Sequence, residues 1–164
     1  MHPSVIPESI RAFWTKFKES MESDPSHRFY EAFHFEDNQA GADELAALVL
    51  SGRKRATAGL VAAYELAGKP IPKIGDLSVV TLFSGEPVCV IETRRVEIVG
   101  FSQVSAEFAA VEGEGDGSLK YWKEAHADYF GRECRRLGLA FEPNIAVVCE
   151  QFEVTFCGPG ENAA

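Results

Sequence analysis

The sequence predicts an α+β fold in which a small, mostly antiparallel β-barrel is flanked by helices. The first observation behind this prediction is a set of three long segments rich in strand-forming residues. The second is that helical patterns stand at the margins of these segments, instead of alternating with them as they do in a parallel sheet. Long antiparallel strands in small number favour a closed or partly open barrel.

An apolar stripe predicts the first helix, which begins near residue 10 and ends before Pro25. The members of the stripe recur every three or four residues, so they share one face of a helix. We expect that face to be buried. The stripe consists of Ile10, Phe13, Trp14, Phe17 and Met21.

A second helix is expected over residues 42–51. Its inward face is predicted to carry Leu45, Leu48 and Val49. Gly52 follows at the position where a left-handed residue commonly ends a helix.

The next part of the chain changes to strand character. Residues 77–83 and 88–99 are rich in strand formers and flank the turn sequence Ser84-Gly85-Glu86-Pro87, so they predict a hairpin. Residues 145–156 predict a third long strand, because apolar and polar residues alternate along its second half. Between these strands we expect a short helix over residues 104–110 and a longer helix capped by Ser118.

Charge and cysteine content limit the function classes. The chain has 16 basic and 25 acidic residues and a net charge of −9, so it has no general attraction for phosphates. Its four cysteines form no C-x-x-C pair, which indicates reduced thiols in a cytoplasmic protein. No apolar run approaches the roughly 18 residues that span a bilayer, and the first residues do not resemble a signal peptide. We therefore expect no membrane partner.

One unusual cluster is basic, with Arg53, Lys54 and Arg55 in succession. It has two interpretations. It can be a basic helix end, stabilised by about 0.3–1 kcal/mol through the helix dipole. It can also be a site in which Lys54 and Thr57 face one cavity. Residues three apart lie on opposite faces of a strand, so the second interpretation requires a turn here, which Gly52 would permit.

A second cluster alternates acids with glycines, at Glu112, Glu114 and Asp116. It can be a solvated loop that caps the following helix. Alternatively, its glycines let the backbone approach a ligand while a carboxylate points into a pocket. Two aromatic residues are weaker candidates. Tyr64 can stack on a base or simply pack, and His126 is interpreted as a structural histidine.

Taken together, four motifs resemble the ASCH domain family, and a bacterial single-domain branch of it in particular. They are G-R-K-x-x-T at residues 52–57, E-G-E-G-D at 112–116, W-x-x-x-H at 122–126 and C-E-x-F at 149–152. The resemblance implies a PUA-like barrel over residues 38–156. Residues 1–37 would then be an N-terminal helix and a lead-in segment that pack on this domain, and residues 157–164 a frayed tail.

The resemblance also implies site residues. Some small members of the family are amidohydrolases that deacylate N4-acetylcytidine with a lysine, a threonine and a glutamate. These roles fall on Lys54, Thr57 and Glu114, with Glu112 as the second choice for the acid. We expect Thr57 to be the nucleophile, Lys54 its base and Glu114 the proton carrier. The expected substrate-binding residues are Arg53, Arg55, Tyr64, Glu112 and Asp116.

The base role requires a neutral lysine, and we expect burial and the neighbouring arginines to lower the pKa of Lys54. Glu114 close to the lysine would raise this pKa, unless the glutamate mainly binds the substrate amine or positions water. Three functions remain open. The first is a hydrolase that deacylates N4-acylated cytidine-type substrates. The second is a ribonuclease that cleaves single-stranded RNA, with a divalent metal as the only cofactor considered. The third is a non-catalytic RNA-binding module. RNA or a modified nucleoside is the expected partner, and the oligomeric state is not predicted.

Overall fold

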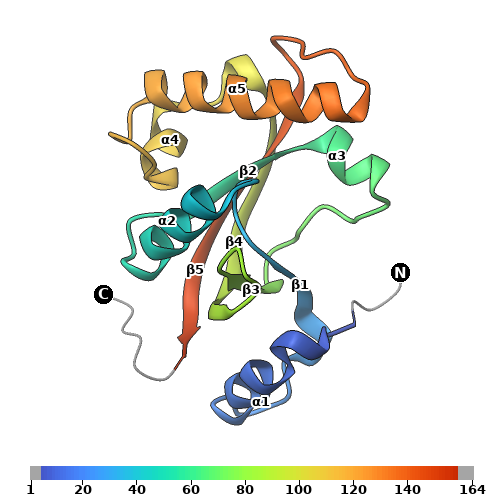
Figure 1. Ribbon diagram of the computed structural model, residues 1–164, viewed down its shortest axis with the longest axis vertical. Helices are drawn as coiled ribbons and strands as arrows, with labels where there is room; N and C mark the ends of the chain where they lie inside the picture. The colour runs from blue at the N-terminus through green and yellow to red at the C-terminus, as the bar shows by residue number, and fades with distance from the viewer. Residues whose placement is uncertain (1–4, 159–164) are drawn as a thin grey trace.

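A computed structural model of the chain describes residues 5–158. In this part of the chain one mixed, mostly antiparallel sheet is surrounded by helices (Figure 1). The strands are Phe29–Phe33 (β1), Ala56–Leu60 (β2), Leu77–Thr81 (β3), Pro87–Gly100 (β4) and Ala146–Cys157 (β5). The α-helices are Arg11–Glu19 (α1), Gln39–Leu50 (α2), Val61–Leu66 (α3), Ala106–Glu112 (α4) and Leu119–Leu137 (α5), and the 3-10 helices are Glu8–Ile10 (η1), Ser26–Arg28 (η2) and Phe101–Gln103 (η3).

The sheet has the strand order β1-β3-β4-β5-β2. Only β1 and β3 pair in parallel among these neighbours, and the other three ladders are antiparallel. The long β4–β5 ladder contains register shifts, one of them between Thr93 and Arg95, and such bulges bend a strand. Within the described residues no ladder joins the edge strands β1 and β2. The α+β prediction is therefore confirmed, whereas closure into a barrel is not shown.

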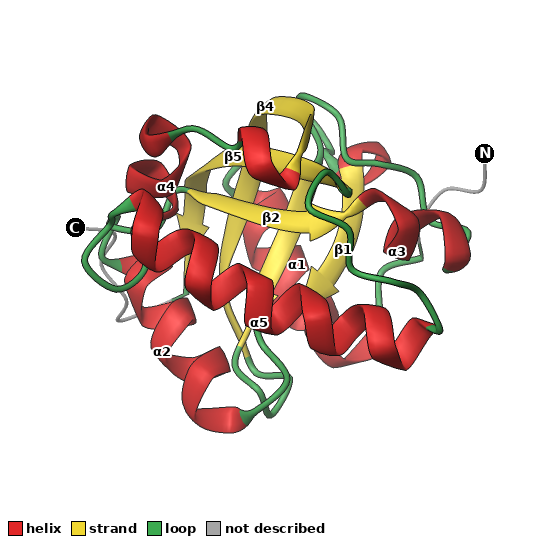
Figure 2. Ribbon diagram, turned by 90° about the horizontal axis from the view of Figure 1, so that it is seen from above, coloured by secondary structure: helices red, strands yellow, loops and turns green. Residues whose placement is uncertain are grey.

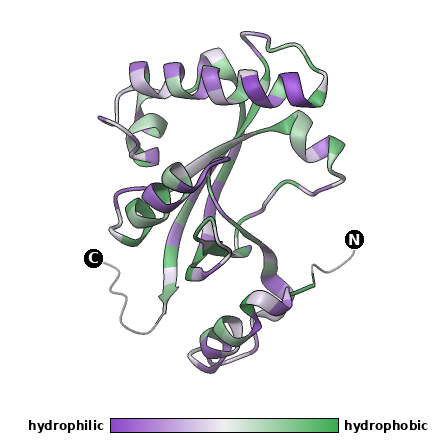
Figure 3. Ribbon diagram, in the orientation of Figure 1, coloured by the Kyte–Doolittle hydropathy of each residue, from purple (hydrophilic) through white to green (hydrophobic). Residues whose placement is uncertain are grey.

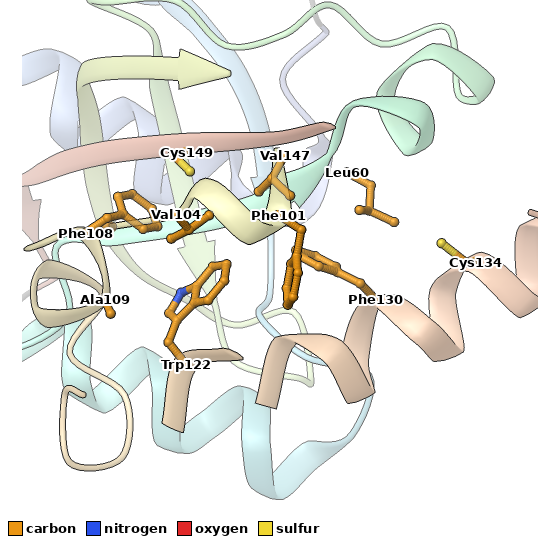
Figure 4. Close-up of a cluster of buried hydrophobic side chains, with 11 residues drawn as sticks. Leu60, Phe101, Val104, Phe108, Ala109, Trp122, Phe130, Cys134, Val147 and Cys149 are labelled. Carbon is orange, nitrogen blue, oxygen red and sulfur yellow. The ribbon is translucent and has the colours of Figure 1, made fainter. Parts of the chain in front are cut away.

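Helix α5 packs across one side of the sheet, where it covers β2 and β5 (Figure 2). Its inward face follows from its sequence, because Trp122, His126, Phe130 and Cys134 recur every four residues and all are buried. Figure 4 shows Trp122 and Phe130 directed toward Phe101 and the neighbouring apolar side chains. Burial of each large side chain contributes on the order of 2–3 kcal/mol. This cluster fixes α5 over the end of the sheet that carries β2.

Helix α1 lies at the opposite end of the molecule from α5 (Figure 1). Polar and apolar residues alternate along both helices (Figure 3), as expected for helices with one buried face. Trp14 and Phe17 of α1 pack against Phe29 and Leu77. The N-terminal segment therefore packs away from α5. No helix within residues 5–158 is long and apolar enough to cross a membrane.

Several predicted elements are confirmed, with shifted ends. The first helix ends at Glu19, so Met21 lies beyond it and is exposed. Helix α2 begins at Gln39 and buries Ala42, Ala46 and Val49, while Leu45 and Leu48 are half-buried. The predicted hairpin is β3–β4, and Ser118 caps α5 as expected. Helix α4 is capped by Ser105.

Other elements were not predicted. Strands β1 and β2 and the short helix α3 are absent from the sequence-based prediction. Strand β1 lies inside the segment that was expected to be an N-terminal helix and a lead-in, and it extends the sheet by pairing with β3. At the other end, Cys157 belongs to β5 rather than to a tail. The rest of the predicted tail, from residue 159 onward, lies outside the described residues.

Candidate active site

A cavity of about 170 Å³ lies between the sheet and α5. Its walls come from β1 and the segment after it, α2 and the turn that follows it, β2, α3, the end of α4 and the loop after it, α5 and β5. Segments far apart in the sequence thus share one small space. Lys54, Thr57, Tyr64, Glu112, Glu114 and Glu150 all line it.

A tight turn after α2 directs Lys54 into this cavity. Gly52 adopts a left-handed φ of 81°, and the backbone N–H groups of Arg53 and Lys54 both donate to the carbonyl of Leu48 at 3.0 Å. The chain then enters β2 at Ala56. Because Lys54 precedes the strand, Lys54 and Thr57 face the same cavity, as the site interpretation of the basic cluster requires.

The Lys54 ammonium is fully paired. Its Nζ donates to the carbonyl of Ala56 at 2.7 Å and to Glu112 Oε2 and Glu114 Oε2 at 2.9 Å each. The Phe35 ring lies below it, with the ring centroid 5.0 Å from Nζ. Since an ammonium has three N–H groups, all of them are used. The Lys54 side chain is almost completely buried.

Glu112 forms the centre of a buried polar cluster. Its Oε1 accepts from Trp122 Nε1 at 2.7 Å and lies 3.4 Å from His126 Nε2. The His126 ring stacks on Trp122 with centroids 4.0 Å apart, and His126 Nδ1 lies 2.9 Å from the Trp122 carbonyl. The W-x-x-x-H spacing therefore places Trp122 and His126 on one face of α5, where both contact Glu112.

These contacts determine the protonation of the cluster. Burial acts to lower the pKa of Lys54, but Glu112 and Glu114 outweigh it and raise that pKa. Burial acts to raise the pKa of Glu112, but Lys54 and His126 hold it well below its usual range. The expected decrease in the pKa of Lys54 is therefore wrong. The two carboxylates each accept from its ammonium at 2.9 Å and raise its pKa, whereas Arg53 and Arg55 are exposed and do not line the cavity.

Two other carboxyl groups in the cavity behave differently. Burial and a hydrogen bond with Glu112 raise the pKa of Glu114 to about 7, against the opposing effect of Lys54. Burial also raises the pKa of Glu150 to about 7, although a hydrogen bond from Thr93 opposes this. Near neutral pH both groups exist partly as carboxylic acids and partly as carboxylates, which suits proton transfer.

Thr57 lies on β2 directly opposite Glu150 on β5. Its hydroxyl makes no hydrogen bond to any other described residue. Tyr64 lies on α3 beside the same strand, since a Cβ added at Gly59 would meet the Tyr64 ring at 3.1 Å. Burial raises the pKa of the Tyr64 hydroxyl, so this side chain stays neutral and presents an aromatic wall to the cavity.

Three predicted binding residues lie outside the cavity wall. Arg53 is exposed and donates from Nη2 to the Gly115 carbonyl at 2.6 Å. Arg55 is exposed on the other side of the turn, near Glu153 and Val154. The carboxylate of Asp116 accepts from the Ser118 backbone N–H at 2.9 Å. The structure thus brings Lys54, Thr57, Tyr64, Glu112 and Glu114 together, but not these three.

The only group of possible metal ligands found among residues 5–158 is Glu112, Glu114 and His126, whose ligand atoms lie within 4.8 Å of one another. The Lys54 ammonium lies 2.9 Å from both carboxylates. A divalent ion would have to displace this buried, fully paired cation. The residues present therefore do not fit a resident metal ion.

The acidic loop approaches the basic turn so closely that Gly113 is required between them. Gly113 ends α4 with a φ of 69°, and a Cβ there would lie 2.2 Å from the Arg53 carbonyl oxygen. We expect Gly113→Ala to unfold at lower urea concentration than Gly117→Ala, with a difference of about 1–3 kcal/mol. Gly117 is the matched control, because its φ is also positive but a Cβ would meet nothing within 4 Å. Equal stabilities of the two variants would contradict a close approach at Gly113.

Two residues of the cavity were not predicted as site residues. His126 was interpreted as structural, and the structure places it against Glu112 at the cavity wall. Glu150 was treated only as part of a strand. Its position next to Val147, Val148 and Cys149 was an available signal, because a glutamate in a buried strand is unusual unless it is paired or functional.

Comparison with known proteins relates this arrangement to a family. The model of the ASCH domain matches residues 31–155. The chain is similar to an ASCH domain from Lactobacillus crispatus JV V101, with a TM-score of 0.86 and 36% identity over 95% of this chain and 99% of that one. It is also similar to protein EF3133 from Enterococcus faecalis V583, with a TM-score of 0.82 and 31% identity over 92% and 90%. No match is found among curated proteins. The chain therefore belongs to the ASCH domain family.

Proposed function

We propose that this protein is a hydrolase that removes an acyl group from the exocyclic amine of an N4-acylated cytidine-type nucleoside. The observation that carries the proposal is the convergence of Lys54, Thr57 and Glu114 on one cavity. They supply a hydroxyl nucleophile, a positive charge and a carboxyl group with a pKa of about 7. Acyl transfer can use these groups as nucleophile, oxyanion stabiliser and proton donor, respectively.

The charge of the cavity supports a neutral substrate. Five glutamates line it, Glu31, Glu36, Glu112, Glu114 and Glu150, against one lysine. This surplus of acids repels a phosphodiester backbone and accommodates an uncharged nucleoside. The volume of about 170 Å³ is also small compared with the ~300–1,000 Å³ of typical ligand pockets, which fits a base with its acyl substituent.

The proposed chemistry assigns Thr57 as the nucleophile that attacks the acyl carbonyl carbon. Lys54 remains an ammonium, because its pKa is raised, and its charge stabilises the oxyanion that develops on the acyl oxygen. Glu114 in its acid form donates a proton to the leaving amine nitrogen. The carboxylate thus formed then activates the water that hydrolyses the acyl-Thr57 ester. Lys54 therefore acts as an electrostatic group here, in place of the base role expected from the resemblance.

Within residues 5–158, no contact favours the two RNA-directed alternatives. A ribonuclease or an RNA-binding module needs cations along a phosphate track. Arg53 and Arg55 lie outside the cavity. The functional test below therefore includes RNA, so that cleavage or binding of RNA would be detected.

The test incubates the purified chain with N4-acetylcytidine and follows cytidine by chromatography. Parallel samples contain labelled single-stranded RNA with and without a chelator. We expect cytidine to form at a rate that the chelator does not change, and we expect the RNA to remain intact. RNA cleavage that the chelator abolishes would favour a metal-assisted ribonuclease. RNA binding with a salt-dependent affinity and no product would favour a binding module.

A further inference from the structure

Glu150 occupies a central place in the cavity wall that the proposed chemistry leaves unused. It lies on β5 between two threonines on the flanking strands. Thr57 on β2 is its direct cross-strand partner, and Thr93 on β4 donates from Oγ1 to Glu150 Oε2 at 2.7 Å. Both Glu150 and Thr93 are buried.

The strand register brings Glu150 within reach of Thr57. Directly opposed residues of an antiparallel pair share one face of the sheet, with Cβ atoms about 4.5–5.5 Å apart. Both side chains line the cavity. The hydrogen bond from Thr93 fixes Oε2, while Oε1 makes no hydrogen bond to another described residue. The free oxygen and the Thr57 hydroxyl therefore face the same small space.

We propose that Glu150 is the general base of this site and takes the proton of Thr57 through Oε1 when Thr57 attacks an acyl carbonyl. The Thr57 Oγ1–H bond breaks, its proton passes to Oε1, and Oγ1 forms the new bond to the acyl carbon. The carbonyl π electrons move to the acyl oxygen. When this intermediate collapses, the carbonyl re-forms and the leaving group departs with the electron pair of its broken bond. An amine leaving group takes a proton from Glu114, a nitrophenolate departs as the anion, and the acyl group remains on Thr57. This inference rests on the proposed function for the nucleophile.

The contacts of Lys54 and Glu112 exclude both residues as the general base and so support the assignment of Glu150. A base must have a free lone pair, and the Lys54 ammonium has none while it donates to Ala56, Glu112 and Glu114. Glu112 is held as a carboxylate by Lys54, Trp122 and His126. Glu150 has no such cation in contact and retains an open oxygen.

Several charged groups around Glu150 set its affinity for the proton. Burial is the largest cause and raises its pKa, and the Thr93 hydrogen bond opposes this. Glu31 on β1 and Asp76 before β3 raise the pKa further, while Lys69 after α3 lowers it. The result is a pKa of about 7. A base with this pKa is partly ionised at neutral pH and accepts a proton readily.

The test uses p-nitrophenyl acetate as the acyl donor and follows acetylation of the peptide that contains Thr57 by mass spectrometry. This readout does not depend on the natural substrate. For the wild type we expect acetylation that rises with pH around a midpoint near 7. Glu150→Gln should slow it by a factor on the order of 10²–10⁴ and remove that rise. Glu153→Gln on the same strand is the matched control and should leave the rate unchanged, because Glu153 is exposed and pairs with Arg94.

A second variant keeps the test decisive if Glu150→Gln folds poorly. Thr93→Val removes the hydrogen bond that lowers the pKa of Glu150. The midpoint of the pH profile should therefore move to higher pH. The inference is overturned if Thr57 is not acetylated in the wild type, or if Glu150→Gln folds and acetylates Thr57 at the wild-type rate. It is also overturned if Thr93→Val leaves the midpoint in place. Loss of nucleoside hydrolysis alone, with Glu150-dependent acetylation retained, would contradict only the proposed substrate.

Discussion

Replacement of Thr57 by alanine is expected to abolish the hydrolysis of N4-acetylcytidine while the protein stays folded. Removal of a nucleophile that acts together with a base costs a factor on the order of 10⁴–10⁶ in turnover. The Thr57 side chain is half-buried, and its hydroxyl makes no hydrogen bond within the described residues. The loss of stability should therefore be about 1 kcal/mol or less. Turnover is measured by chromatography and stability by urea denaturation.

Two further variants make this result specific. Thr57→Ser keeps a hydroxyl at the same position and should retain measurable turnover. Thr155→Ala removes a threonine from an exposed position on β5, outside the cavity, and should leave the rate unchanged. Unchanged hydrolysis in Thr57→Ala would refute the nucleophile role.

The sequence predicted those elements whose local pattern and burial agree. Helix α5 is an example, because its cap at Ser118 and the spacing of Trp122, His126 and Phe130 all predict the same helix. Strand β2 is the opposite case. The segment from Ala56 to Leu60 contains alanine and glycine and lacks the β-branched pattern of a strand. It becomes a strand because it pairs with β5 along its whole length, which is a tertiary interaction that local propensity does not contain.

In the candidate site, too, the local sequence predicted some features, whereas others depend on tertiary contacts. The resemblance placed Lys54 and Thr57 on one short segment, and the structure places both in the cavity. The expected pKa of Lys54 was wrong because burial and the two neighbouring arginines were expected to outweigh any carboxylate beside the ammonium. Its actual partners, Glu112 and Glu114, lie 58 and 60 residues further along the chain. The pKa of a buried group depends on contacts that the fold creates. Sequence neighbours alone therefore predict the direction of its pKa shift poorly.

Replacement of Lys54 by methionine is expected to destabilise the fold by about 3–5 kcal/mol at pH 8, because it leaves buried carboxylates without their cation. Methionine retains much of the apolar length of the side chain, so the loss reports charge rather than volume. Urea denaturation measures the difference. Lys18→Met is the matched control, since the Lys18–Asp24 pair is exposed, with 3.7 Å between Nζ and Oδ2. That variant should lose less than about 1 kcal/mol.

The pH dependence identifies the cause of the Lys54→Met effect. Lys54 lowers the pKa of both Glu112 and Glu114, so its removal raises both values in the folded protein. A carboxyl whose pKa is higher in the folded state than in the unfolded state costs stability as the pH rises, and this cost disappears when the pH falls. The difference between Lys54→Met and the wild type should therefore be largest at pH 8 and smaller at pH 5. Addition of Glu114→Gln should restore part of the lost stability at pH 8, because one of the uncompensated carboxylates is then neutral at every pH. A pH-independent difference, or one below about 1 kcal/mol, would mean that the Lys54 charge does not hold this cluster together.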